Sequence, residues 1–293
     1  MTAFLFKTIF RLLALLPLQV LHRLGELLGR LTDALSAQYA ARTRENLRQA
    51  NLTQDEAGFQ RTLSATIAES GKSLTELAWI WRRSYEEVLG KVRECRGLEH
   101  IAAAQARGKG LIFLTPHLGC FEISALYAAQ RMPITVLYRP PKLRWLEGVM
   151  LAGRERGQAK LAKADVSGVR LLFKALKRGE AIGLLPDQVP SKGEGEWVDF
   201  FGRPAYTMTL VGRLAESSGA TVLIAYSERL PHGQGYVIHV EPLSLDFSQP
   251  VPRQINAALE QAIRACPAQY LWSYNRYKVP RGVSAPPPLT TLH

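Results

Sequence analysis

The chain has 293 residues, 47% of them hydrophobic, so it can bury the core of one large domain or two small ones and is too apolar to be disordered. Its net charge of +12 favours a polyanionic partner, which could be nucleic acid, an anionic lipid or a phosphorylated substrate. Its three cysteines, Cys95, Cys120 and Cys266, form no CxxC pair, which argues against a disulfide framework and a zinc ribbon.

Residues 1–30 are the most apolar segment, and we predict an amphipathic helix there. Lys7 and Arg11 interrupt the uncharged stretch of about 20 residues that a membrane span needs. At about 100° per residue, polar side chains gather on one face and large apolar ones on the other, as in helices that lie in a membrane interface. A membrane span and packing on the protein's own core are the alternatives. Pro17 is expected to kink the helix.

The rest of the chain divides into a helical part at 31–97 and a part at 98–280 where strands alternate with helices. Helices are predicted at 36–50 and at 53 to about 83, where the capping sequence TQDE at 53–56 opens the helix. Another follows the first predicted strand and ends at about 130. Further helices are predicted at 142–155, 167–178, 207–219 and 252–265. Strands are predicted at 110–115, 134–138, 181–186, 221–228 and 236–242. This alternation predicts an α/β fold with a mixed, mostly parallel sheet covered by helices. We expect one catalytic domain at 31–280 and a loose, proline-rich tail at 281–293.

Polar residues follow three of the predicted strands. His117 comes after the first strand, Arg139 after the second, and Asp187 with Gln188 after the third. Ligands and catalytic groups gather at the carboxyl ends of the strands in open α/β sheets. We therefore expect these side chains to converge on one site.

The stretch LIFLTPHLGCFE places His117 and Glu122 five positions apart. On one continuous helix the two side chains would lie about 140° apart. Pro116 cannot continue the strand and Gly119 permits a tight turn, so we expect His117 in a loop and Glu122 in the first turn of the next helix. The glutamate would reach back to one imidazole nitrogen, and the other nitrogen would take a proton from a substrate hydroxyl.

Other chemistries at this stretch are weaker hypotheses. Cys120 suggests an alternative mechanism, a thiol catalyst paired with a histidine. The favoured interpretation is that Cys120 serves only as a small apolar side chain on the buried face of the helix. A metal centre is disfavoured because no second histidine lies at ligand spacing, and we predict neither a metal nor another cofactor. A non-enzymatic binder of membranes or nucleic acid would leave His117 and Glu122 unexplained. The chain also lacks the basic, aromatic-rich stripe that stacks bases, so no nucleic-acid partner is expected.

The pattern H-x4-E after a strand resembles the H-x4-[DE] motif of the glycerolipid and lysophospholipid acyltransferases. It is closer still to the late acyltransferases of lipid A biosynthesis, the lauroyl and myristoyl transferases. Further blocks resemble this family in order over about residues 3–280: LYRP, GRERGQAK, ALKRGEAIGLLPDQ, VDFFGRPAYT and PAQYLWSYNRYK. Val189 and Pro190 depart from members that carry an acidic residue after the D-Q pair.

The resemblance implies transfer of a fatty acyl chain from acyl carrier protein or coenzyme A to a hydroxyl of a phosphorylated glycolipid. A Kdo-bearing lipid A precursor is the expected acceptor, with another glycolipid or a lysophospholipid as the alternative. The resemblance also implies an enzyme on the cytoplasmic face of the inner membrane. There its single N-terminal anchor and its basic charge would meet anionic lipids.

The resemblance also assigns roles to residues. His117 would be the general base and Glu122 its orienting partner. The expected substrate-binding residues are Arg139, Arg154, Arg156, Asp187 and Gln188. The arginines are candidates for holding phosphate, because a planar guanidinium binds phosphate oxygens bidentately. A structural ion pair between Arg154 and Asp187 is the alternative for those two residues.

Overall fold

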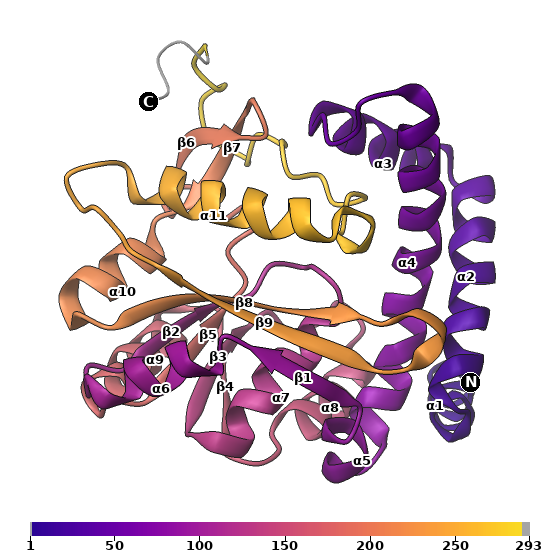
Figure 1. Cartoon of the computed structure of the whole chain (residues 1–293), viewed down its shortest axis with the longest axis horizontal. Coiled ribbons are helices and arrows are strands. Elements are labelled where there is room, and N and C mark those ends of the chain that lie inside the picture. The colour runs from indigo at the N-terminus through magenta and orange to yellow at the C-terminus, as the bar shows by residue number, and fades with distance from the viewer. Residues whose placement is uncertain (1, 289–293) are drawn as a thin grey trace.

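Seven strands form one mixed sheet in the computed structural model, which describes residues 2–288 (Figure 1). The strand order is β1-β9-β8-β2-β5-β3-β4, and neighbours are parallel except β8 and β9. These strands are β1 (Val92–Arg96), β2 (Leu111–Leu114), β3 (Ile134–Tyr138), β4 (Ala159–Lys163), β5 (Ala181–Leu184), β8 (Thr221–Arg229) and β9 (Tyr236–Leu243). A separate hairpin joins β6 (Gly195–Phe200) to β7 (Arg203–Met208). The predicted α/β fold with a mostly parallel sheet is confirmed.

Helices precede, connect and cover these strands. The helices are α1 (Thr2–Leu15), α2 (Leu18–Leu35), α3 (Ala37–Gln49), α4 (Glu56–Arg82), α5 (Tyr85–Leu89), α6 (Leu98–Ala106), α7 (Phe121–Arg131), α8 (Arg144–Arg154), α9 (Val166–Lys177), α10 (Leu210–Ser218) and α11 (Val251–Ala265). Two short 3-10 turns occur at Pro231–Gly233 and Pro267–Gln269. Each helix predicted after residue 35 has a counterpart among them.

Some boundaries and elements differ from the prediction. Asp55, rather than Thr53, caps α4, because its carboxylate accepts the Gly58 N–H at 2.6 Å. The helix predicted at 207–219 begins later, since Thr207 and Met208 pair with β6. The edge strands β1 and β4 were not predicted. Their sequences, VRECR and AKLAK, carry the charges that blunt an exposed sheet edge and so lack an apolar run.

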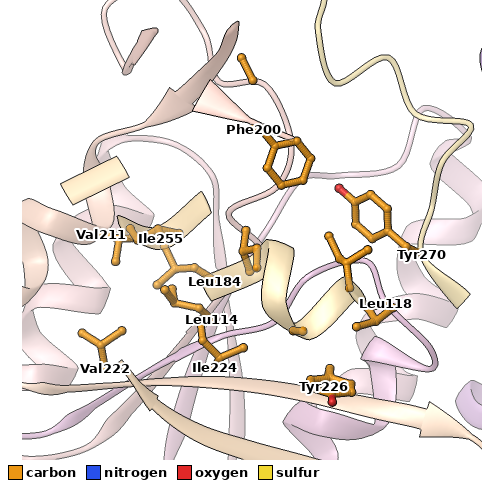
Figure 2. Close-up of a cluster of buried hydrophobic side chains, with 14 of the residues drawn as sticks. Leu114, Leu118, Leu184, Phe200, Val211, Val222, Ile224, Tyr226, Ile255 and Tyr270 are labelled. Carbon is orange, nitrogen blue, oxygen red and sulfur yellow. The ribbon is translucent and has the colours of Figure 1, made fainter. Parts of the chain in front are cut away.

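The sheet separates two hydrophobic cores, because successive side chains of a strand point to opposite faces. On β2, Ile112 and Leu114 belong to one core, while Leu111 and Phe113 belong to the other. Figure 2 shows the first core, where Leu114 lies near Ile255 of α11. Figure 1 shows α11 on one side of β8 and β9 and α7 with α8 on the other. Burial on both faces explains why β2 and β5 read as continuous apolar runs.

The N-terminal segment forms two helices, because Pro17 interrupts the predicted single helix. Figure 1 shows α2 running beside α4. Their backbones touch through glycines: a Cβ at Gly71 would lie 1.8 Å from the Gly25 carbonyl oxygen, and one at Gly29 would lie 2.1 Å from the Ile67 carbonyl oxygen. The predicted boundary at residue 30 therefore falls inside a packed helix. None of the described helices is both long and apolar enough to cross a membrane.

The tail predicted at 281–293 is only partly described. Residues 281–288 form no helix or strand. They are not wholly loose, because the Trp197 indole donates a hydrogen bond to the Ser284 carbonyl at 3.2 Å. The last five residues of the predicted tail lie outside the described part of the chain.

A buried cluster of charges ties the N-terminal helices to the end of β8. Arg229 donates from Nε to Glu76 of α4 at 2.9 Å and from Nη1 to Glu69 at 2.6 Å. The Tyr236 hydroxyl also donates to Glu76, and the His22 ring of α2 lies 3.4 Å from the same carboxylate. Burial alone would raise the pKa of Glu76, but Arg229 outweighs it and lowers that pKa to about 2.

We expect Glu76→Gln to lower the free energy of unfolding by about 3 kcal/mol at neutral pH, because it leaves buried Arg229 without its main partner. The folded-state pKa of about 2 lies below the ordinary 4.5. The stabilisation is therefore present above pH 4.5 and is lost as the pH falls towards 2. Denaturant titrations should show the gap between wild type and variant narrowing on acidification. Glu56→Gln, at an exposed position of the same helix, is the control. A gap that is constant with pH would contradict this account.

Candidate active site

The strand order brings His117 and Asp187 together. β2 and β5 are parallel neighbours in register, with Leu114 opposite Leu184, and both chains leave the sheet at the same edge. His117 Nδ1 lies 2.8 Å from Asp187 Oδ1. The backbone N–H of His117 donates to the other carboxylate oxygen, also at 2.8 Å. The predicted convergence at the carboxyl ends of these two strands is confirmed.

These contacts define the tautomer of His117. A carboxylate can only accept, so Nδ1 carries the proton and donates to Asp187. In the neutral ring Nε2 then has a lone pair, which accepts from the Gln188 side-chain amide at 3.1 Å. Burial disfavours the charge on Asp187, but the charge and hydrogen bonds of His117 outweigh burial and hold the pKa of this carboxyl below its usual value. The histidine is thus held with a basic nitrogen facing away from its carboxylate.

Glu122 lies in the first turn of α7, as predicted, but its expected hydrogen bond to His117 is wrong. Its carboxylate accepts from the Trp81 indole N–H at 3.0 Å and from Arg154 Nε at 2.8 Å, and its second oxygen accepts from Arg154 Nη2. The first turn of α7 therefore directs Glu122 towards α4 and α8. Asp187 occupies the place beside the imidazole that the sequence analysis gave to Glu122.

Arg154 forms its ion pair with Glu122, so the alternative of a pair with Asp187 is also wrong. The guanidinium lies 5.7 Å from the centre of the Trp81 ring. Burial opposes its charge, but Glu122 outweighs burial and raises the pKa of Arg154. Arg154 and Glu122 both line the cavity described below.

The two other predicted arginines differ from each other. Arg156 donates to three backbone carbonyls, those of Gly153 at 2.6 Å, Arg83 at 2.9 Å and Ile80 at 2.7 Å. These bonds occupy its guanidinium and fasten the end of α8 to α4, so Arg156 is a structural residue. Arg139 is exposed and lines the cavity with His117 and Gln188.

A cavity of about 1010 Å³ opens beside His117 and has two apolar lobes, one over each face of the sheet. We name them after their helices. The α7 lobe is lined by buried residues of the core beneath α7: Phe113, Ala128, Val136, Ala225 and Ile238. The α9 lobe is lined by residues of the opposite core: Leu137, Phe173, Leu184, Met208 and Leu210. A mostly apolar cavity with a few polar groups at its mouth is typical of a site for an amphiphilic small molecule.

Comparison with known proteins identifies the family. A family model described as "Bacterial lipid A biosynthesis acyltransferase" matches residues 1–279, nearly the whole chain. The chain belongs to this family.

Individual relatives agree with this assignment. The acyltransferase is 29% identical to the lipid A biosynthesis lauroyltransferase of Escherichia coli (strain K12), over 92% of this chain and 89% of the relative. It is 26% identical to the lipid A biosynthesis palmitoleoyltransferase of the same organism, over 90% and 86%. It is also 26% identical to a lipid A biosynthesis acyltransferase of Haemophilus influenzae, over 89% and 82%. The predicted family and the predicted enzyme class, an acyltransferase, are confirmed.

The geometry of this lipid A acyltransferase disfavours thiol chemistry at Cys120. The side chain is 2% exposed in the core beneath α7. Burial raises the pKa of its thiol well above the usual value, whereas a reactive cysteine needs an accessible thiolate. Among the residues that the structure describes, no group of three or more histidine, cysteine, aspartate or glutamate side chains could hold a metal ion.

Three residues at this candidate site were not predicted. Trp81 donates a hydrogen bond to Glu122, and its ring lies 6.0 Å from that of Phe10 on α1. The N-terminal helix therefore contacts a residue that helps to position Glu122. Arg170 of α9 and Arg213 of α10 line the α9 lobe. Each lies inside a helical sequence pattern with nothing to distinguish it from a solvated surface residue.

Proposed function

We propose that this acyltransferase moves a fatty acyl chain from a thioester donor, acyl carrier protein or coenzyme A, to a hydroxyl of a phosphorylated lipid A precursor. His117 acts as general base. The observation that carries the proposal is the His117–Asp187 pair, whose basic Nε2 lies at a cavity with an apolar lobe for the acyl chain. Names of the relatives, which include a lauroyl- and a palmitoleoyltransferase of lipid A biosynthesis, support the same substrates.

The proposed reaction begins when the acceptor hydroxyl replaces Gln188 as the hydrogen-bond partner of His117 Nε2. The hydroxyl oxygen attacks the thioester carbonyl carbon while Nε2 takes the hydroxyl proton. Asp187 stabilises the imidazolium that forms. The new C–O bond is completed as the C–S bond breaks, and the imidazolium returns the proton to the leaving thiolate. The products are an ester and a free thiol, so no protein nucleophile and no redox partner are needed.

Glu122 and Arg154 have a different role in this proposal. Glu122 holds the Arg154 guanidinium at the cavity wall, where it binds a phosphate group or negative charge that develops on the substrate. Arg139 supplies a second cation at the same mouth. Asp187, assigned to substrate binding by the sequence analysis, acts instead as the positioning residue of His117.

Mass spectrometry of the products tests the proposal. The purified protein is incubated with one acyl donor and, in parallel, with a Kdo-bearing lipid A precursor, a second glycolipid and a lysophospholipid. We expect a mass gain of one acyl chain on the lipid A precursor. Faster transfer to the lysophospholipid would assign the protein to the alternative acceptor class, and transfer to none of them would contradict the mechanism.

The α7 lobe is expected to limit acyl chain length at Gly183. A Cβ there would approach Val136 Cγ2 at 3.3 Å and Ile134 Cδ1 at 3.7 Å, so a larger side chain displaces substrate or neighbours. We expect Gly183→Leu to lower transfer of long chains more than of short ones, by about fourfold for each methylene that no longer fits. Product spectra from a mixture of donors of different lengths measure this. Gly148→Leu, at an exposed position with open space around it, is the control. If the folded variant transfers chains of each length in the same proportions as wild type, the acyl chain does not bind in the α7 lobe.

We also propose that α1 and α2 hold the protein in the cytoplasmic leaflet of the inner membrane. One side of α2 packs on α4, while its other side and α1 present large apolar side chains to solvent. Among the leucines of these helices whose side chains the structure describes, those more than half exposed are Leu12, Leu15, Leu27, Leu31 and Leu35. Arg11, Arg23 and Arg30 are exposed on the same two helices, where they would meet anionic lipid. Packing of this face on the protein's own core is not supported.

Replacing Leu27, Leu31 and Leu35 together with serine is expected to move the protein from sedimenting with anionic phospholipid vesicles into the supernatant. Each leucine side chain removed from the membrane lowers the favourable free energy of membrane binding by up to about 1.5–3 kcal/mol. The glycine contacts with α4 are untouched, so the fold should persist, whereas deleting residues 1–30 would also remove them. The control replaces Leu98, Phe247 and Val279, which are exposed elsewhere. Equal sedimentation of wild type and triple variant would contradict the proposed anchor.

A further inference from the structure

The α9 lobe carries two arginines that the mechanism above does not use. Arg170 comes from α9 and Arg213 from α10, and both are exposed and line the cavity. Neither side chain makes a hydrogen bond or ion pair with any residue between 2 and 288. Two arginines on different helices that line one lobe form a cationic rim.

Asp165 and Glu194 also line this lobe, but among the described residues neither carboxylate forms an ion pair with Arg170 or Arg213, and neighbouring donors engage both. Asp165 accepts the Gly168 N–H at 3.0 Å and the Ser167 hydroxyl at 2.6 Å, as the cap of α9. Glu194 accepts the Ser191 N–H at 3.1 Å. No carboxylate in the described part of the chain is therefore paired with either guanidinium group, and both groups can bind an anionic part of a ligand.

The floor beneath these arginines is apolar. Phe173, Met208 and Leu210 are partly buried and pack against the core on this face of the sheet. A cationic rim above an apolar floor complements an amphiphile that has a phosphate group next to a hydrocarbon part. Guanidinium groups bind phosphate oxygens through charge-assisted, often bidentate, hydrogen bonds.

The two lobes lie on opposite faces of the sheet, because two consecutive residues of β5 face different lobes. Gly183 faces the α7 lobe and Leu184 the α9 lobe. Chains lying on opposite faces of the sheet can meet only beyond the carboxyl edge of the strands. His117 stands at that edge, after β2.

We propose that Arg170 and Arg213 bind a phosphate group of a substrate whose hydrocarbon part lies on the α9 lobe. The cavity thus receives two lipid-like groups, one over each face of the sheet, and brings them together at His117. The inference rests on the proposed function only for the identity of the phosphate. That phosphate belongs either to the phosphopantetheine arm of the donor or to the glycolipid acceptor.

Calorimetric titration of the full-length protein with decyl phosphate and with decanol tests the binding site without any transfer reaction. We expect wild type to bind decyl phosphate at least about tenfold more tightly than decanol, because charge-assisted hydrogen bonds are the strong ones. The double variant Arg170→Gln/Arg213→Gln should lose this preference. The control Lys174→Gln/Lys177→Gln removes the same charge from exposed positions of α9 that do not line the cavity, and it should keep the preference.

Kinetics then assign the phosphate. A raised KM for the donor alone places the phosphopantetheine arm at the rim, and a raised KM for the acceptor alone places the glycolipid there. The inference is overturned if the double variant binds decyl phosphate as wild type does, or if the lysine control loses as much affinity. If the protein binds decyl phosphate through these arginines but transfers no acyl group, the proposed function fails and the phosphate site stands.

Discussion

Replacing His117 with alanine is expected to lower kcat by at least about 10²- to 10⁴-fold, the usual contribution of a general base. The variant has no side chain that can take the proton of the acceptor hydroxyl. The fold should persist, because buried Asp187 keeps its hydrogen bond from the backbone N–H of residue 117. Steady-state transfer assays, with thermal unfolding measured on the same preparations, check both expectations.

His100→Ala is the matched control for His117→Ala. His100 is partly exposed on α6 and does not line the cavity, so its loss should leave kcat unchanged. Transfer at the wild-type rate by the folded His117→Ala protein would rule out the general-base mechanism.

The second large effect is expected for Asp187→Asn, which should lower kcat by up to about 10⁴-fold, as a carboxylate-to-amide change does in other histidine-based sites. The amide can donate to Nδ1, which favours the tautomer that protonates Nε2 and removes the basic lone pair. Burial would raise the pKa of Asp187, but the charge and hydrogen bonds of His117 outweigh burial and hold that pKa below its usual value, so the carboxylate is charged at neutral pH.

Glu122→Gln distinguishes the two possible partners of His117. It keeps the shape of the side chain but weakens the hold on Arg154. If Asp187 orients the imidazole, this variant should raise KM through Arg154 and lower kcat less than Asp187→Asn does. The opposite order, with Glu122→Gln the more damaging change in kcat, would restore the orienting role that the sequence motif suggested.

The sequence by itself determined the fold class and the position of His117. Apolar runs bounded by glycine and proline mark β2, β3 and β5, because strands covered on both faces must be apolar throughout. Pro116 and Gly119 end β2 and turn the chain, so His117 had to lie in a loop before α7. The edge strands β1 and β4 escaped detection because solvent on their outer side allows charged residues in them.

Only the tertiary structure decided which side chains meet. Sequence neighbours suggested Glu122 for His117, but β5 lies directly beside β2 and delivers Asp187, which is 70 residues away in the chain. Glu122 turns instead to Trp81 and Arg154, which arrive from α4 and α8. Contacts of this kind depend on strand order and helix packing, and local residue patterns carry no information about them. The same holds for the α9 lobe, whose two arginines come together only because α9 and α10 cover one face of the sheet.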